Sequence, residues 1–192
     1  MKKVFLTLAF LVLAISANAQ TKSDIEASYE RAMKLQRLMN DAPKGCGVSA
    51  VDKYLQSVNA AAVLAIENST KLSDFYYREI GETKDGVTDV TIKKPSVDEV
   101  VSLSVTITGE TAAIKTAKES LEEATKETKD LAEKVKTEKN PVKKGKAAKQ
   151  SKDAAAIMAF SSDALAIITE ESVAQGKAIQ ELIETVKSRK NL

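Results

Sequence analysis

Residues 96–139 read SVDEVVSLSVTITGETAAIKTAKESLEEATKETKDLAEKVKTEK, and this stretch decides the fold that we expect. Mostly apolar side chains recur at every seventh position from Val100 to Val135, and a second series lies three residues behind, from Leu103 to Leu131. Such an a/d pattern is typical of a helix that buries one narrow face against partner helices. The stretch therefore predicts one long helix.

This predicted helix has both a start signal and a stop signal. Ser96 and Glu99 form a capping-box sequence directly after a proline, and this arrangement commonly opens a helix. Asn140-Pro141 is expected to end it near Lys139, because the residue before a proline disfavours helical geometry.

Two more helices are predicted on the N-terminal side. Residues 49–80 repeat an a/d pattern in which Asn68 is the polar member, a position where an amide can fix the register between helices. A shorter helix is predicted at 23–40, with Ser23 and Glu26 as its capping box.

A fourth long helix is predicted after Gly145, running to about residue 188. Its section 154–168 contains only Asp163 as a charged residue, so we expect that section to be buried on most sides. The link at 81–95 carries turn residues and several β-branched residues, and we expect it to be a break with at most a short extended stretch or hairpin.

The predicted fold class is all-α: an elongated antiparallel helical bundle of three long helices plus a shorter N-terminal helix. Short links make successive helices antiparallel. Counting back from the 81–95 link places the start of the second helix opposite about Thr128 of the third. The hairpin of the third and fourth helices should therefore project past the rest by roughly 15 Å, as a coiled-coil-like tip.

The first residues have the pattern of a secretory signal sequence. Lys2 and Lys3 precede an apolar run over 4–15, and Ala17 and Ala19 frame a cleavage site. The run is too short to span a bilayer, although an uncleaved anchor is the alternative. We predict a signal peptide at 1–19, a single helical-bundle domain at 20–192, an exported (periplasmic or secreted) location, and no transmembrane span once the signal is removed.

The composition excludes several function classes. The chain has no histidine, which removes Ser/His and Cys/His nucleophile pairs and the usual zinc sites. Removing Lys2 and Lys3 with the signal leaves 27 basic residues against 27 acidic ones, so net charge does not indicate a nucleic-acid partner. We predict no enzyme activity, no catalytic or metal site and no cofactor.

Two acidic residues nevertheless stand at positions expected to be buried. Glu110 occupies a seam position of the third helix, and Asp163 lies in the apolar section of the fourth. Either carboxyl group would have a shifted pKa if buried. The alternative is an ordinary paired or solvent-facing side chain. The adjacent pairs Glu122–Glu123 and Glu170–Glu171 are poor candidates for a shared site, because neighbouring helical residues point in different directions.

The clearest local feature is a cluster of lysines at the predicted tip, opposed between residues 134 and 152 only by Glu138. We predict that they contact an anionic surface, such as lipid head groups, acidic polysaccharide or an acidic protein face. The alternative is a solvated hairpin end. The lysines are Lys134, Lys136, Lys139, Lys143, Lys144, Lys146, Lys149 and Lys152.

Cys46 is the chain's only cysteine and lies in the loop sequence Pro43–Gly47. It is a candidate free thiol, either reactive or paired between two chains. The alternative is a small residue held in a turn.

These observations lead to two hypotheses of function. The first is an exported, non-enzymatic helical-bundle protein that acts as a structural or interaction module of the bacterial cell envelope, through a protein partner or self-association. The alternative is a membrane-active or lipid-binding protein that uses the lysine-rich tip together with the apolar sections 59–66 and 154–168.

Overall fold

The structure is a computed structural model that describes residues 22–190. It confirms the all-α prediction, because the described residues form four helices and no strand. A single β-bridge between Glu82 and Thr88 marks the link that was expected to have some extended character. The predicted signal peptide, residues 1–19, lies outside the described residues. The helices are α1 (Lys22–Asn40), α2 (Ser49–Ile80), α3 (Val97–Thr137) and α4 (Pro141–Lys190).

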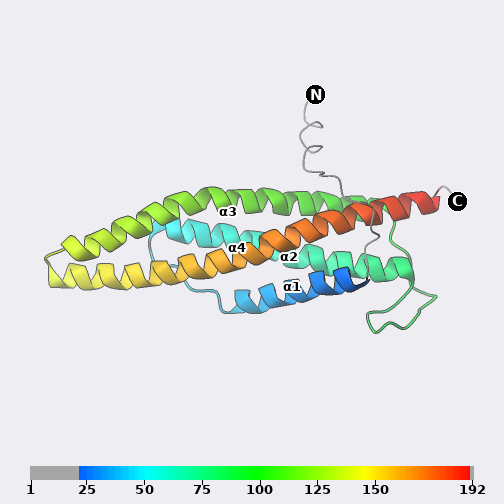
Figure 1. The fold of residues 1–192 in the computed structure, drawn as a ribbon, viewed down its shortest axis with the longest axis horizontal. Coiled ribbons are helices and arrows are strands. Elements are labelled where there is room, and N and C mark those ends of the chain that lie inside the picture. Colours follow the sequence, from blue (N-terminus) through cyan, green and yellow to red (C-terminus); the bar gives the residue numbers. More distant parts are fainter. Residues whose placement is uncertain (1–21, 191–192) are drawn as a thin grey trace, which may run out of the picture.

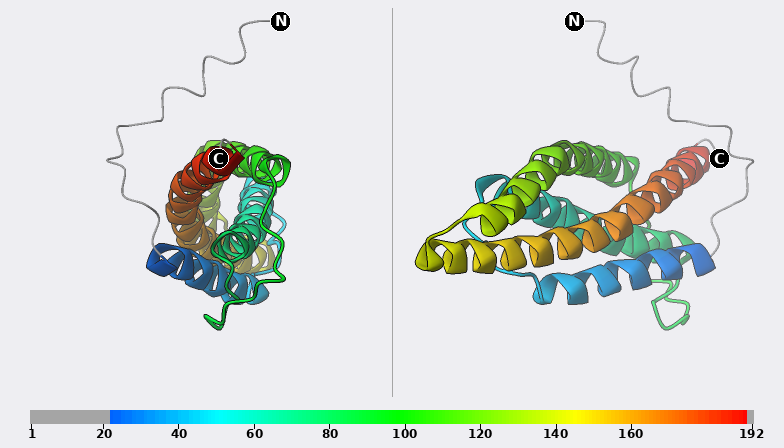
Figure 2. Two further views of the ribbon diagram at one scale, coloured as in Figure 1. Left: turned by 90° about the vertical axis from the view of Figure 1, so that its right-hand side faces the viewer. Right: turned by 60° about the vertical axis from the view of Figure 1, so that its left-hand side comes forward.

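The four helices form an elongated antiparallel rod (Figure 1). α2 and α4 pack against each other, and both α1 and α3 pack against this pair. α1 and α3 therefore lie on opposite sides, as the end-on view shows (Figure 2). None of the helices within residues 22–190 combines the length and apolarity that crossing a membrane requires.

The predicted boundaries of α2 and the start of α3 are confirmed. Gly81 has a φ of +74° and its N–H bonds to the Tyr77 carbonyl, an end in the left-handed conformation that glycine adopts without strain. Ser96 and Glu99 form both hydrogen bonds of the capping box at the start of α3. α3 ends at Thr137, slightly before the expected residue.

The prediction that α4 begins after Gly145 is wrong. α4 begins at Pro141, and the Asn140 side-chain oxygen accepts hydrogen bonds from the N–H groups of Val142 at 3.0 Å and Lys143 at 3.2 Å. Asn140 is thus the N-cap of α4, and proline suits the first helical position because the N–H that it lacks has no helical partner there. The dipeptide that ends α3 also starts α4.

Two further expectations need correction. α1 already includes Lys22, so Ser23 lies within the helix instead of capping it. Section 154–168 is buried along one face only, through residues such as Ile157 and Ile168. Alanine is small and uncharged enough to occupy either side of a helix, so the low charge of this section did not indicate burial all round. Its exposed side contains Ala155, Ala156, Ala159 and Ala166.

The interior consists of two apolar clusters. The first lies toward the α3–α4 turn and includes Tyr54, Ile114 and Ile157. The second lies toward the other end and includes Leu72 and Ile179. Between them every helix contributes polar side chains, which we call the polar layer: Ser28 and Arg31 from α1, Asn68 and Ser69 from α2, Thr106 and Glu110 from α3, and Glu171 and Gln175 from α4.

The α3–α4 hairpin projects beyond α2, as predicted. The N–H of Ala50, at the start of α2, donates to the Glu127 carboxylate at 3.1 Å. α3 continues from Glu127 to Thr137, which is ~15 Å of helix at 1.5 Å per residue. The projecting end is visible at the left of Figure 1. We call residues 131–152 the hairpin tip.

Candidate functional sites: the hairpin tip and the polar layer

All eight predicted contact lysines are exposed, and the structure brings them together at the hairpin tip. Within the described residues only Lys136 has a carboxylate at ion-pairing distance, that of Glu133 at 2.7 Å. Glu138, the acidic residue expected to oppose the lysines, instead accepts a hydrogen bond from the Asn140 N–H at 2.8 Å. The tip therefore presents a group of lysines whose charges are largely uncompensated.

Lysine at the start of α4 does not help that helix to form. The N-terminal end of a helix dipole is positive, so a cation in the first turn is unfavourable by about 0.3–1 kcal/mol at low ionic strength. Yet the first turn of α4 contains no acidic residue and includes Lys143 and Lys144. The first turns of α1, α2 and α3 each contain an acidic residue. Helix stability does not explain these lysines.

The core of the tip is thin. Ala147 is buried there, whereas Leu131 and Val135 are only partly buried. Val142, at the turn, is 80% exposed. Two helices enclose less volume than three or four, and the small side chains match that geometry.

The polar layer centres on Glu171, whose side chain is 0% exposed. Arg31 of α1 donates to its carboxylate at 2.8 Å, and the hydroxyl groups of Ser28 and Ser69 donate to the same carboxylate. The Gln175 amide contributes a longer bond at 3.3 Å. This buried charge thus has one cationic partner and several neutral donors, as burial requires.

Glu110 is the second buried carboxyl group of the layer, and it is also 0% exposed. The Asn68 amide donates to one of its oxygens at 2.7 Å, while the other oxygen has no hydrogen-bond partner. Burial raises the pKa of Glu110 to about 7, and the charge of Glu171 acts in the same direction. Asn68 and Ser172 act in the opposite direction on the pKa without cancelling the shift.

Asn68 is buried at its seam position, as the pattern predicts, and its role in fixing the register between helices stays a prediction. It donates to Glu110 and accepts a hydrogen bond from the Thr106 hydroxyl at 2.8 Å. The buried position expected for Glu110 is confirmed. The burial expected for Asp163 is wrong, because that side chain faces solvent.

Sequence reasoning missed Glu171. It dismissed Glu170–Glu171 because adjacent helical residues diverge, and they do: the Glu170 side chain is 70% exposed. A usable signal was present in the spacing of Ile168, Glu171, Gln175 and Ile179. These residues share one face of the helix, so polar side chains continue the apolar stripe into the core.

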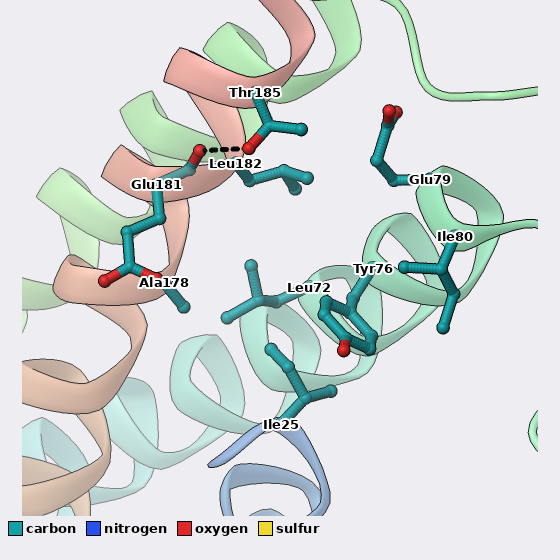
Figure 3. Close-up of a pocket in the computed structure, with 9 residues that line it drawn as sticks. All are labelled: Ile25, Leu72, Tyr76, Glu79, Ile80, Ala178, Glu181, Leu182 and Thr185. Atoms are coloured by element: carbon teal, nitrogen blue, oxygen red, sulfur yellow. Dashed lines mark hydrogen bonds between the residues drawn. The ribbon is translucent and has the colours of Figure 1, made fainter. Parts of the chain in front are cut away.

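A cavity of about 220 Å³ lies at the other end of the bundle, between α1, α2 and α4 (Figure 3). Ile25, Leu72 and Leu182 line it. Glu79 also lines it, but Arg189 binds this carboxylate at 2.6 Å. The Glu79 carboxylate points away from this largely apolar space (Figure 3).

Cys46 lies in the loop between α1 and α2 and is partly buried against the first apolar cluster. The N–H groups of Cys46 and Gly47 donate to the Asp52 carboxylate at 2.7 Å and 2.9 Å. Burial raises the pKa of the Cys46 thiol, which lowers its thiolate fraction. These contacts favour a residue held in a turn over a reactive thiol, and pairing between chains stays a prediction.

Residues 22–190 contain no group of three or more Cys, Asp or Glu side chains arranged to hold a metal ion. Comparisons with known proteins give no further indication of function, since no family model, curated protein or solved structure matches the chain.

Proposed function

We propose that this chain is an exported, non-enzymatic helical-bundle protein, a structural or interaction module of the bacterial cell envelope whose hairpin tip contacts anionic material. The proposal rests on one observation above all: the eight lysines of the tip are exposed, most of them beyond the body of the bundle, and Lys136 alone of the eight has an ion-pair partner within the described residues.

The chemistry of the tip favours multipoint electrostatic contact. Each lysine near an anionic surface contributes about 1 kcal/mol, and the attraction declines within a Debye length. The segment from Lys134 to Lys152 contains neither arginine nor an aromatic residue. Bidentate recognition of a single phosphate and stacking on bases are therefore disfavoured. The expected ligand is a surface or polymer that carries many negative charges.

Insertion of apolar helix sections into a membrane is the less favoured alternative. Sections 59–66 and 154–168 supply buried residues of the first apolar cluster, such as Ala61 and Ile157. Exposing them to lipid would require the bundle to open and to lose that packing. Binding to lipid head groups through the tip needs no such opening, so the proposal includes lipid binding only as contact at the membrane surface.

The test compares two variants that remove the same number of charges. The tip variant is K143Q/K144Q/K146Q/K149Q, and the control is K53Q/K71Q/K118Q/K177Q, which neutralises exposed lysines on the body. Each protein is titrated against an acidic uronate polysaccharide, against phosphatidylcholine vesicles, and against the same vesicles containing phosphatidylglycerol.

We expect the wild type to bind at least one anionic ligand at low ionic strength and to release it in high salt. The tip variant should bind that ligand on the order of 1,000-fold more weakly, since four contacts of about 1 kcal/mol are removed and each 1.4 kcal/mol is tenfold. The control should bind within a few-fold of the wild type. Equal losses in both variants, or no binding by the wild type in any arm, would refute the proposal.

A further inference from the structure

The polar layer contains an imbalance of charge. Glu110 on α3 and Glu171 on α4 are both fully buried carboxyl groups. The layer's one cation is Arg31 of α1, which binds Glu171. The layer's other members on α2, α3 and α4 are neutral: Asn68, Ser69, Thr106 and Gln175. With both carboxyls ionised, one negative charge in the layer has no counter-charge.

We propose that Glu110 is a proton-operated switch: α3 packs tightly against α2 and α4 while its carboxyl group is protonated, and loss of the proton loosens that packing. Uptake of one proton makes the layer electrically neutral. It also removes the charge from a carboxyl group with one oxygen that has no hydrogen-bond partner. A buried charge without a cation is costly, whereas a neutral carboxyl group is tolerated.

The helix around Glu110 is suited to local loosening. Residues 104–111 read SVTITGET, a run of β-branched residues, serine and glycine with low helix propensity. Gly109 has no neighbouring atom that a side chain would meet. Burial of Ile107 and Ile114 on either side of Glu110 therefore holds this stretch in place. When the layer between them becomes charged, this is the part of α3 with the least intrinsic tendency to stay helical.

The sign of the effect follows from linkage. The pKa of Glu110 is raised from 4.5 to about 7 in the folded chain, so the folded state binds this proton more tightly than the unfolded state. The contribution of Glu110 to stability is fully present below about pH 4.5 and is lost as pH rises through about 7. A shift of that size corresponds to a fall on the order of 100-fold in the folding equilibrium constant, since each pKa unit is tenfold.

Few other side chains of this protein titrate in the pH range of the proposed switch. The chain has no histidine, the side chain that ordinarily titrates between pH 5 and 8. Glu99 has a pKa lowered to about 2 by hydrogen bonds from Ser96 and Arg78, and the pKa of Cys46 is raised from 9.0. In the folded chain the Glu99 carboxyl group therefore stays ionised and the Cys46 thiol stays mainly protonated across this range.

The experiment uses the full chain without its predicted signal and follows urea unfolding from pH 5 to 8.5. E110Q is the key variant, because glutamine imitates the protonated carboxyl group, and E123Q is the control at an exposed position of α3. The wild type and E123Q should lose stability through about pH 7, whereas E110Q should stay near the high level. Hydrogen-exchange protection of residues 103–117 should fall over the same pH range in the wild type but not in E110Q.

The proposal is overturned if E110Q retains the pH dependence of the wild type, or if the wild type shows none. If E110Q does not fold, the carboxyl carbon of Glu110 is titrated in the wild type by NMR. A midpoint of about 6 or above supports the switch, and a midpoint below about 6 overturns it.

Discussion

Removing the cation of the polar layer should be among the most damaging single changes on the surface of α1. Arg31→Met keeps most of the length and apolar stem of the side chain but removes the guanidinium that binds Glu171 at 2.8 Å. Glu171 is 0% exposed, so its carboxylate then stays in the core with only the neutral donors Ser28, Ser69 and Gln175.

The size of the loss in stability depends on how deeply Arg31 and Glu171 are each buried. Breaking a buried ion pair by removing one partner costs about 3–5 kcal/mol, because a charge is left uncompensated. The Arg31 side chain is 25% exposed, so water can partly replace it, and neutral donors remain. We therefore expect Arg31→Met to lower the free energy of unfolding by ~2–3 kcal/mol.

A double-mutant cycle measures the coupling. Glu171→Gln removes the charge that needs the cation, so Arg31→Met should cost ~1–2 kcal/mol less in that background than in the wild type. Arg37→Met is the matched control, since Arg37 is an exposed arginine of the same helix, and should change stability by less than ~0.5 kcal/mol. The assay is urea unfolding followed by circular dichroism at pH 7. Equal effects of Arg31→Met and Arg37→Met, or zero coupling in the cycle, would show that the pair is not the centre of the layer.

Three further predictions follow from single contacts. Lys143→Glu/Lys144→Glu should raise the thermal midpoint, since an acidic residue at the start of α4 stabilises the helix by ~0.3–1 kcal/mol, and should weaken binding of the anionic ligand. Calorimetry measures the first effect and titration the second, and a lowered midpoint would contradict the dipole argument. Asn68→Ala should cost ~1–3 kcal/mol in urea unfolding because Glu110 and Thr106 lose their partner, and a cost equal to that of the exposed control Gln56→Ala would contradict this. Ser96→Ala should cost ~1 kcal/mol through loss of the capping box, with early fraying of residues 97–100 in hydrogen exchange, and unchanged exchange there would count against the cap.

Much of the fold was predictable because its signals are local and repetitive. The sevenfold spacing across α2 and α3 determines which face is buried, and Gly81 and the Ser96–Glu99 box determine where helices end and begin. The Asn140-Pro141 dipeptide shows the limit of such signals. Its chemistry is equally suited to ending one helix and starting the next, and only the turn geometry shows that it does both.

The buried part of the site was harder to predict because its partners are distant in sequence. Glu110 could be suspected from its seam position alone. Glu171 could not be paired with Ser28, Arg31 or Ser69 without knowing which helices lie side by side. The lysines of the tip were visible directly, since they are close in sequence. The burial of section 154–168 on most sides was predicted wrongly, because hydropathy does not distinguish an exposed alanine from a buried one.

The central structural claim is that the α3–α4 hairpin extends beyond the start of α2 and carries most of its lysines away from the body. Pulsed electron paramagnetic resonance tests this most directly, with spin-label pairs at Ser49–Lys129 and Ser49–Thr137 in a Cys46→Ser background, all three labelled positions being exposed. The Ser49–Thr137 distance should be the longer of the two, because Thr137 lies ~12 Å farther along α3. Equal distances, or a shorter one to Thr137, would mean that the hairpin folds back on the bundle.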